Sequence, residues 1–213
     1  MFGPLKTLLF LAVLWLPLSF FVWFYFAQLW VTPIASLASS VLQAWLPQVF
    51  TGVEQTQHML SFITTLPVDP AQLAGIDLSQ GRPAVVVDAN PMIYGYSIPV
   101  LVGLVMATPL SNGRRALQVV IGVIVLLAVQ TYGTVFDVLK SVGLQAGAEG
   151  ARVIAEAGLS PNMIAFCYQF GYLVLPAITP VILWVMFNQP FIQTLVTAEG
   201  SDIPTPGTDQ HQP

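Results

Sequence analysis

The chain has 213 residues, of which 55% are hydrophobic and only 8% carry a charge. Soluble domains contain about 25% charged residues, so this composition excludes an ordinary soluble globular protein. Six basic and ten acidic residues give a net charge of -4, and the sequence has no basic stripe that could neutralise a nucleic-acid backbone. The composition therefore indicates an integral membrane protein that does not bind nucleic acid.

Four stretches are predicted to be transmembrane helices, because about 20 apolar residues cross a hydrocarbon core of about 30 Å. They run from Thr7 to about Val31, from about Met92 to Leu110, from about Ala116 to Leu139 and from about Asn162 to Phe187. The first stretch is longer than the core of a signal peptide, which has about 7 to 15 residues, so we expect an uncleaved anchor.

Few charges bear on the orientation of these spans. Lys6 precedes the first span, and Arg114 and Arg115 lie in the turn between the second and the third. Basic residues close to spans favour the cytoplasm, although Lys140, just past the third span, argues the other way. We predict cytoplasmic N- and C-termini.

With cytoplasmic termini, the segment between the first and second spans (32–91) lies outside the cytoplasm, and we call it the first outer segment. It begins with Thr32 as a predicted helix N-cap and Pro33 at the first helical position. Apolar residues then recur on one helical face, with uncharged polar residues opposite, which predicts an amphipathic helix over 33–50 along the membrane surface. The absence of charge leaves two interpretations open, packing on its own protein and docking of another membrane protein.

Beyond this helix the composition changes toward strands. Residues 57–66 and 84–88 are rich in β-branched and apolar residues and are separated by the Pro/Gly-punctuated stretch from Pro67 to Pro83. They predict a small β-hairpin, which should rest on the amphipathic helix or on a partner chain because two strands are marginal alone. The predicted fold class is an all-α integral membrane protein, with four transmembrane helices and a small extracytoplasmic insertion of an amphipathic helix plus a β-hairpin.

A second outer segment lies between the third and fourth spans. Its sequence predicts a short helix over 148–157, with charged residues on a face toward solvent. Gly158 is suited to end this helix, and Ser160–Pro161 to begin the fourth span, in which Pro176 and Pro180 predict a kink. The predicted organisation is an N-terminal transmembrane helix (1–31), an outer segment (32–91), a three-helix core (92–187) and a cytoplasmic tail (188–213) that is largely disordered from Glu199.

No Asp, Glu, Lys, Arg or His lies near the middle of any predicted span, which argues against a pump or an ion-coupled transporter. Gln130 and Gln169 would lie about 14 and 10 Å deep, close enough for contact. The polar groups fit an aromatic belt with interhelical hydrogen bonds, or a groove for a peptide or a partner helix. The candidate binding cluster is Tyr94, Tyr96, Gln130, Tyr168, Gln169 and Tyr172.

The sequence predicts no catalytic, metal or cofactor site. Cys167 is the single cysteine, flanked by Phe166 and Tyr168, and the histidines His58 and His211 are distant in sequence. A nucleophilic cysteine needs a base within hydrogen-bond reach, and a metal needs several ligands. We therefore expect Cys167 to be structural.

Several short motifs occur in a fixed order along the chain. They are Asn90–Pro91 with Tyr94, Tyr96 and Pro99, then Thr108–Pro109 before Arg114–Arg115, then Gly122 and Gln130, and finally Tyr168 to Tyr172 with Pro176 and Pro180. In their order and spacing, over about residues 53–187, the chain resembles the small exosortase-associated membrane proteins, particularly those that accompany the H-type exosortases.

The resemblance implies an accessory protein of the bacterial inner membrane that works beside an exosortase-like membrane protein. Exosortases resemble cysteine transpeptidases and process sorting signals of exported proteins with an intramembrane Cys, Arg and His. Cys167 has no membrane-embedded Arg or His, so the enzymatic role is not carried over. We expect a non-enzymatic partner or substrate-presenting subunit. Two alternatives stay open, a degenerate membrane-embedded cysteine transpeptidase and a small passive permease gated by the fourth span.

Overall fold

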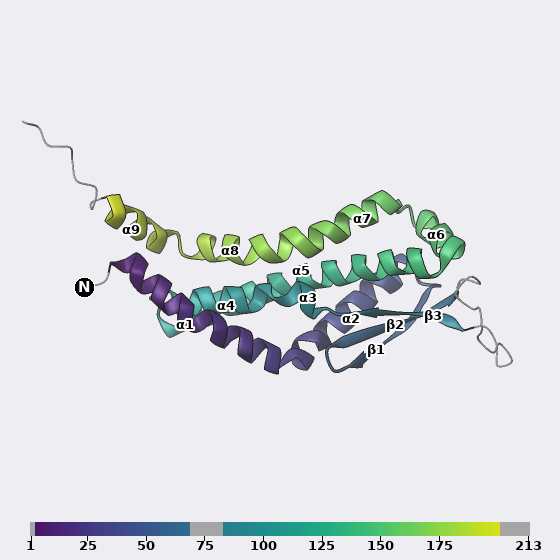
Figure 1. The fold of residues 1–213 in the computed structure, drawn as a ribbon, viewed down its shortest axis with the longest axis horizontal. Coiled ribbons are helices and arrows are strands. Elements are labelled where there is room, and N and C mark those ends of the chain that lie inside the picture. The colour runs from purple at the N-terminus through teal and green to yellow at the C-terminus, as the bar shows by residue number, and fades with distance from the viewer. Residues whose placement is uncertain (1–2, 69–82, 201–213) are drawn as a thin grey trace, which may run out of the picture.

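The computed structural model describes residues 3–68 and 83–200 and shows an elongated helical bundle with a small sheet at one end (Figure 1). We call this the sheet end, and we call the opposite end, which has Arg114 and Arg115, the arginine end. Residues 69–82 and 201–213 lie outside the description. They include most of the predicted strand connection, His211 and most of the predicted disordered tail.

The axis of the bundle is α5, Asn112–Gln145, whose 34 residues span about 51 Å. It extends well beyond the predicted third span at both ends, so its last turns reach the sheet. Gly122 lies so close to Leu101 on the neighbouring helix that a Cβ there would collide with the leucine side chain. Small residues in this helix thus let its neighbours approach closely.

Two helices precede the sheet, α1 at Pro4–Tyr25 and α2 at Ala27–Trp45, separated by a break at Phe26. The predicted start at Thr32 is wrong, because its hydroxyl donates back to the carbonyl of Gln28 at 3.0 Å and the helix continues through it. A threonine inside a helix often makes this bond. The apolar face of α2 packs on α5 and on the sheet, which is the first of the two interpretations left open above.

The sheet is antiparallel in the order β1 (Phe50–Thr56), β2 (Met59–Pro67) and β3 (Ala84–Ala89). It has one strand more than the predicted hairpin, because the residues before the predicted first strand also form a strand, β1, which turns back into β2 at Gln57, with φ of 56°. Alternate residues of β2 and β3 are buried. This face rests against α2 and α5.

The predicted second span is a shorter, broken helix formed by α3 (Met92–Gly95) and α4 (Ser97–Ala107). The break fits Pro99, which lacks the N–H that would bond the carbonyl four residues earlier. Helix α4 packs against α1, where the Ser19 hydroxyl donates to the Pro99 carbonyl at 2.8 Å. Within the described residues, three helices are long and apolar enough to span a membrane: α1, α5 and the helix over Pro161–Phe187.

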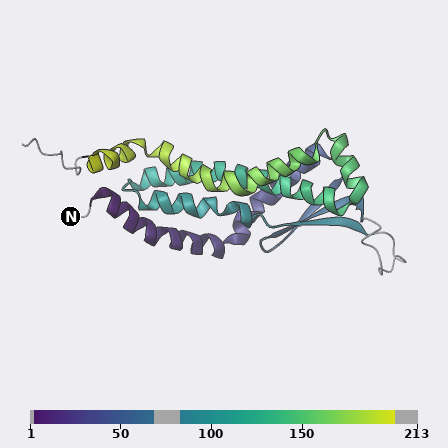
Figure 2. The same ribbon diagram turned by 45° about the horizontal axis from the view of Figure 1, so that its top comes forward.

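The helix over Pro161–Phe187 lies alongside α5 in both ribbon views (Figures 1 and 2). It consists of α7 (Pro161–Gln169), the π-helical turn η2 (Phe170–Val174) and α8 (Leu175–Phe187). The π turn directly precedes Pro176, whose missing N–H interrupts the ladder at the position where the sequence predicts a kink.

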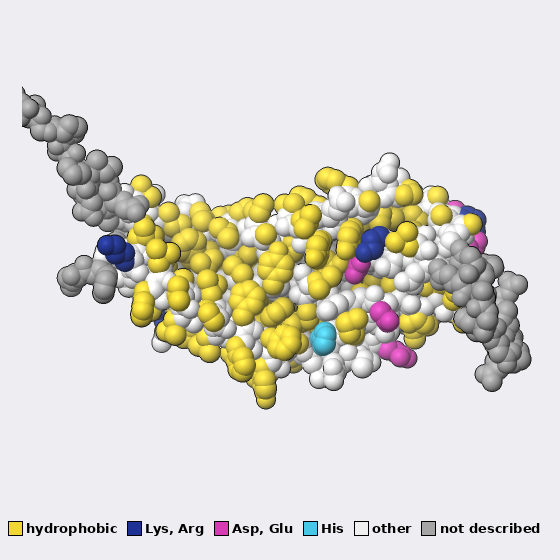
Figure 3. Space-filling view, viewed as in Figure 1, with side chains coloured by type: hydrophobic (Ala, Val, Ile, Leu, Met, Phe, Trp, Pro, Cys, Tyr) yellow, Lys and Arg dark blue, Asp and Glu magenta, His cyan; other side chains and the backbone are white. Residues whose placement is uncertain are grey.

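Two short helices complete the described chain, α6 (Gly147–Glu156) and α9 (Gln189–Gly200). The structure confirms the predicted signals around α6: Gly158 has φ of 75°, and the Ser160 hydroxyl accepts from the Met163 N–H at 3.2 Å to cap α7. Helix α9 occupies the first part of the predicted tail. In the space-filling view, hydrophobic side chains cover the bundle, and charged side chains gather toward its two ends (Figure 3).

Candidate functional site

The candidate site is centred on Tyr94, which lies on α3 and is fully buried. Its ring packs on Gly133 of α5, where a Cβ atom would lie only 2.5 Å from Tyr94 Cδ1. The ring also meets Tyr172 edge-on, with centroids 6.2 Å apart. Among the described residues no group hydrogen-bonds to the Tyr94 hydroxyl. The ring contacts hold Tyr94 in place, and the Asp137 carboxylate of α5 lies near its hydroxyl.

The contacts continue from Tyr172 on η2 to Tyr168 on α7, whose rings stack at 6.0 Å with planes 1° apart. Lys140 Nζ of α5 lies 3.7 Å from the centroid of the Tyr168 ring, and it forms a 2.8 Å ion pair with Asp137. A cation over an aromatic face is attracted by the ring quadrupole. We call Tyr94, Tyr172 and Tyr168 the tyrosine row; it joins α3 to α7 and ends on this ion pair.

Gln130 lies beside the tyrosine row on α5 and is fully buried. Its Nε2 donates to the Pro91 carbonyl at 2.8 Å, and a Cβ on Gly95 would collide with its amide. Its Oε1 has no hydrogen-bond partner among the described residues. Gln130 thus fastens α5 to the start of α3.

Gln169 does not join this site. It is exposed on α7, and no hydrogen bond connects it with Gln130 in the described part of the chain. Depth alone suggested that the two glutamines could meet, but the direction of each side chain around its helix decides contact, and the two point to different surroundings. Tyr96 lies half-buried at the break between α3 and α4 and packs on the core.

The structure thus brings Tyr94, Tyr168 and Tyr172 together, with Gln130 beside them. Sequence reasoning missed the pairing of Asp137 with Lys140, although the spacing of three residues on a helix indicates such pairs. It also missed the glycine contacts that let the rings approach α5. Only the structure shows which ring each glycine faces.

An exposed aromatic surface lies on the same helix as Tyr168 and Tyr172. Phe166 and Phe170 stack with centroids 6.0 Å apart and planes 11° apart, and Phe166 is 65% exposed. Leu173, one turn further, is also exposed. We call Phe166, Phe170 and Leu173 the aromatic face. Stacking restricts the motion of the two rings. Phe170 and Leu173 lie on the π-helical turn η2, and such turns are often found at functional sites.

Residues 3–191 match the family described as exosortase H-associated membrane protein. The chain belongs to this family. The match spans the tyrosine row, the aromatic face and all three long apolar helices, and it confirms the resemblance drawn from the motifs. Comparisons with curated proteins and with solved structures gave no match.

In this exosortase H-associated protein, Cys167 is a half-buried thiol packed against the hydrophobic core. His58 lies in the turn between β1 and β2, on a different element. Among the described residues no three His, Cys, Asp or Glu side chains gather in a way that could hold a metal ion. The Tyr132 side chain of α5 lies beside the Cys167 thiol and interacts with it, and no histidine among the described residues lies beside the thiol.

Proposed function

We propose that this chain is a non-enzymatic accessory subunit of an exosortase-type sorting system in the bacterial inner membrane. In this proposal it binds the exosortase, or presents substrate to it, through the aromatic face. The family match supports an exosortase partner. The chemistry of the described site supports binding, since it consists of stacked rings, one ion pair and the half-paired amide of Gln130.

We further propose four membrane crossings, with α3 and α4 together as the short second crossing. The cytoplasmic side is the arginine end, where Lys6, Arg114 and Arg115 lie, because basic residues near spans favour the cytoplasm. Lys140 lies at the other end, but Asp137 compensates its charge at 2.8 Å. Its weight against this orientation is therefore reduced.

The observation that carries the binding role is the exposure of the stacked Phe166 and Phe170 on the helix that also carries Tyr168 and Tyr172 of the tyrosine row. Rigid aromatic side chains that lose little freedom on binding dominate many interfaces. The two rings of the face stack on each other, and Lys140 contacts the neighbouring Tyr168 on the same helix. The stacking preorganises the face before a partner binds.

Co-purification with the cognate exosortase in mild detergent tests this role. The double variant Phe166→Ala, Phe170→Ala is expected to lower the recovered exosortase at least about tenfold, as loss of an aromatic anchor does at other interfaces. The matched control is Ile178→Ala, Ile182→Ala, which removes two similarly exposed apolar side chains from α8. Equal recovery with both variants would contradict the role of the aromatic face.

The enzymatic alternative is tested separately through Cys167. The variant Cys167→Ser is expected to leave processing of an exported substrate unchanged when the exosortase is present. Processing that stops in this variant, while the protein remains in the membrane and still binds its partner, would show that the thiol performs chemistry.

A further inference from the structure

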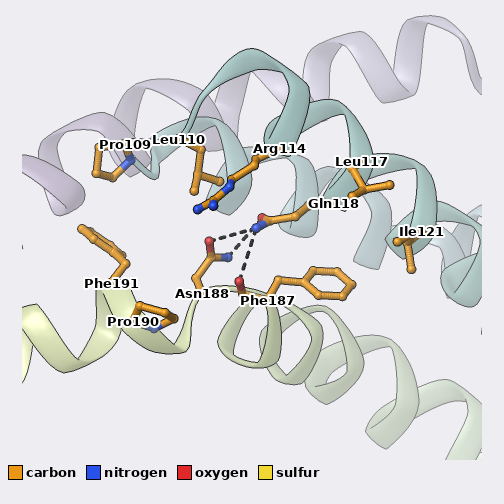
Figure 4. A pocket seen from close by; sticks show the side chains of 10 residues that line it. All are labelled: Pro109, Leu110, Arg114, Leu117, Gln118, Ile121, Phe187, Asn188, Pro190 and Phe191. Atoms are coloured by element: carbon orange, nitrogen blue, oxygen red, sulfur yellow. Dashed lines mark hydrogen bonds between the residues drawn. The ribbon is translucent and has the colours of Figure 1, made fainter.

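A second candidate site lies at the arginine end, far from the aromatic face. It is a cavity of about 410 Å³ between the start of α5 and the junction of α8 with α9 (Figure 4). Arg114, Leu117 and Ile121 of α5 line one side, and Phe187 and Phe191 line the other. The cavity therefore has a cation in its wall and apolar side chains on both sides of it (Figure 4).

The back of the cavity is closed by Gln118 and Asn188. Each amide nitrogen donates to the other's oxygen, at 3.0 and 3.1 Å, and Asn188 Nδ2 also donates to the Trp184 carbonyl at 2.9 Å (Figure 4). A long bond of 3.5 Å from Gln118 Nε2 to the Phe187 carbonyl uses the remaining donor. The two amides form a wall that leaves no hydrogen-bond donor for a ligand.

Positive potential at the cavity comes from Arg114 and the helix that carries it. Arg114 is exposed and makes no ion pair within the described residues, and none of the described lining residues is acidic. It lies in the first turn of α5, whose N-cap Ser111 makes no side-chain capping bond and which has no acidic residue in that turn. An uncapped N-terminus of a long helix attracts anions.

The apolar lining continues from Arg114 along α5. Leu117 and Ile121 follow at three and seven residues, so they lie on the same helical face, and both are exposed. Their position toward the middle of the bundle places them beside lipid chains if α5 crosses the membrane. A ligand that fits must therefore be anionic at one end and apolar along the rest.

We propose that this cavity binds one anionic phospholipid, with its phosphate at Arg114 and an acyl chain along Leu117 and Ile121. Basic pockets between transmembrane helices bind anionic headgroups in this way. The site does not rest on the partner-binding role, because it lies at the opposite end of the bundle and uses none of the aromatic face.

Native mass spectrometry of the purified full chain with added lipids tests the site. The wild type is expected to retain phosphatidylglycerol about fivefold better than phosphatidylcholine, the ratio that one basic contact supplies. Arg114→Gln should remove this preference, and Arg114→Lys should keep most of it. Lys6→Gln, which deletes a charge outside the cavity at the same end, should leave the preference unchanged.

Three results would overturn the proposal. The first is equal retention of both lipids by the wild type, and the second is a loss in Lys6→Gln as large as in Arg114→Gln. The third is displacement of phosphatidylglycerol by millimolar inorganic phosphate, which would show that the cavity takes a free anion and not a lipid. Lipid preference that survives phosphate and depends on Arg114 supports it.

Discussion

Two glutamines on α5 are placed in contrasting ways. Gln118, near the arginine end, exchanges two hydrogen bonds with Asn188, so both of its polar atoms are paired. Gln130, toward the sheet end, is fully buried, but only its nitrogen has a partner among the described residues. At the arginine end, a pair of amides therefore holds α5 to the junction of α8 with α9. At the sheet end, the packing of the Tyr94 ring on Gly133 holds α3 to α5, and the aromatic face lies at this end too.

The largest expected effect is at the sheet end, with Gly133→Ala. The added methyl would meet the buried Tyr94 ring, which has no room to move, and overpacking of this kind costs about 1 to 3 kcal/mol. The free energy of unfolding, measured by denaturant titration in detergent, should fall accordingly. The matched control is Gly113→Ala, where a Cβ has nothing within 4 Å. An equal effect of both variants would refute this role of the Tyr94 packing on Gly133.

At the arginine end, Gln118→Leu should cost about 2 kcal/mol of unfolding free energy. The substitution removes the two hydrogen bonds that join the buried Asn188 amide to Gln118, and an unpaired buried polar group costs about 1 to 3 kcal/mol. The double variant Gln118→Leu, Asn188→Leu should recover part of this loss, because neither amide is then left unpaired. No recovery would show that the amides do not act as a pair.

A smaller loss, about 1 kcal/mol, is expected for Gln130→Leu, since a single interhelical hydrogen bond in a membrane contributes about that much. Gln169→Leu is the matched control and should leave stability unchanged, because Gln169 is exposed and unbonded in the described chain. The double variant also tests the polar-groove hypothesis. Full exosortase recovery with both glutamines replaced would exclude a polar groove and leave the aromatic face as the binding surface.

The ion pairs should have the smallest effects. Lys140→Gln removes a half-buried ion pair and the contact with Tyr168, and we expect a loss of about 0.5 to 1 kcal/mol. Arg152→Gln removes two exposed ion pairs on α6 and should leave the free energy of global unfolding unchanged, with any effect confined to local opening of α6. If Arg152→Gln destabilises the protein as much as Lys140→Gln, then burial does not explain the difference between them.

Lowering the pH should destabilise α6 by protonating Glu149. The hydrogen bond from Arg152 holds the pKa of the Glu149 carboxyl below its usual value. A lowered pKa stabilises the folded helix above the unfolded value of about 4.3, and this stabilisation is lost as the pH falls through the folded value. The protection factors of the α6 amides, which are corrected for the slower intrinsic exchange at acid pH, should therefore fall on acidification more in the wild type than in Glu149→Gln. An equal fall would contradict a role for this pair.

Hydropathy predicted the long spans, because the length of an apolar run is a local property of the sequence. It overestimated the second span, where Pro99 breaks the helix and separates α3 from α4. It also missed β1, since the turn at Gln57 has no glycine or asparagine to indicate it. Thr32 and Pro33 form a good start signal, but the same two residues also fit inside a helix once Phe26 provides the break.

The candidate site could be predicted only in part. The tyrosines were found from residue type and depth, and three of them meet in the structure. The pairing of Gln130 with Gln169 was wrong because depth does not determine the direction of a side chain around a helix. The Arg114 cavity was not anticipated, since it depends on the junction of α8 with α9 lying beside the start of α5, a tertiary arrangement that no local pattern encodes.

Site-specific photocrosslinking in native membranes tests the central claim most directly. A photoreactive amino acid is placed at Phe166 in one variant and at Ile182 in another, two exposed positions on the same long helix. The account predicts a crosslink to the exosortase from position 166 and lipid adducts alone from position 182. A crosslink to the exosortase from position 182 and not from 166 would contradict it.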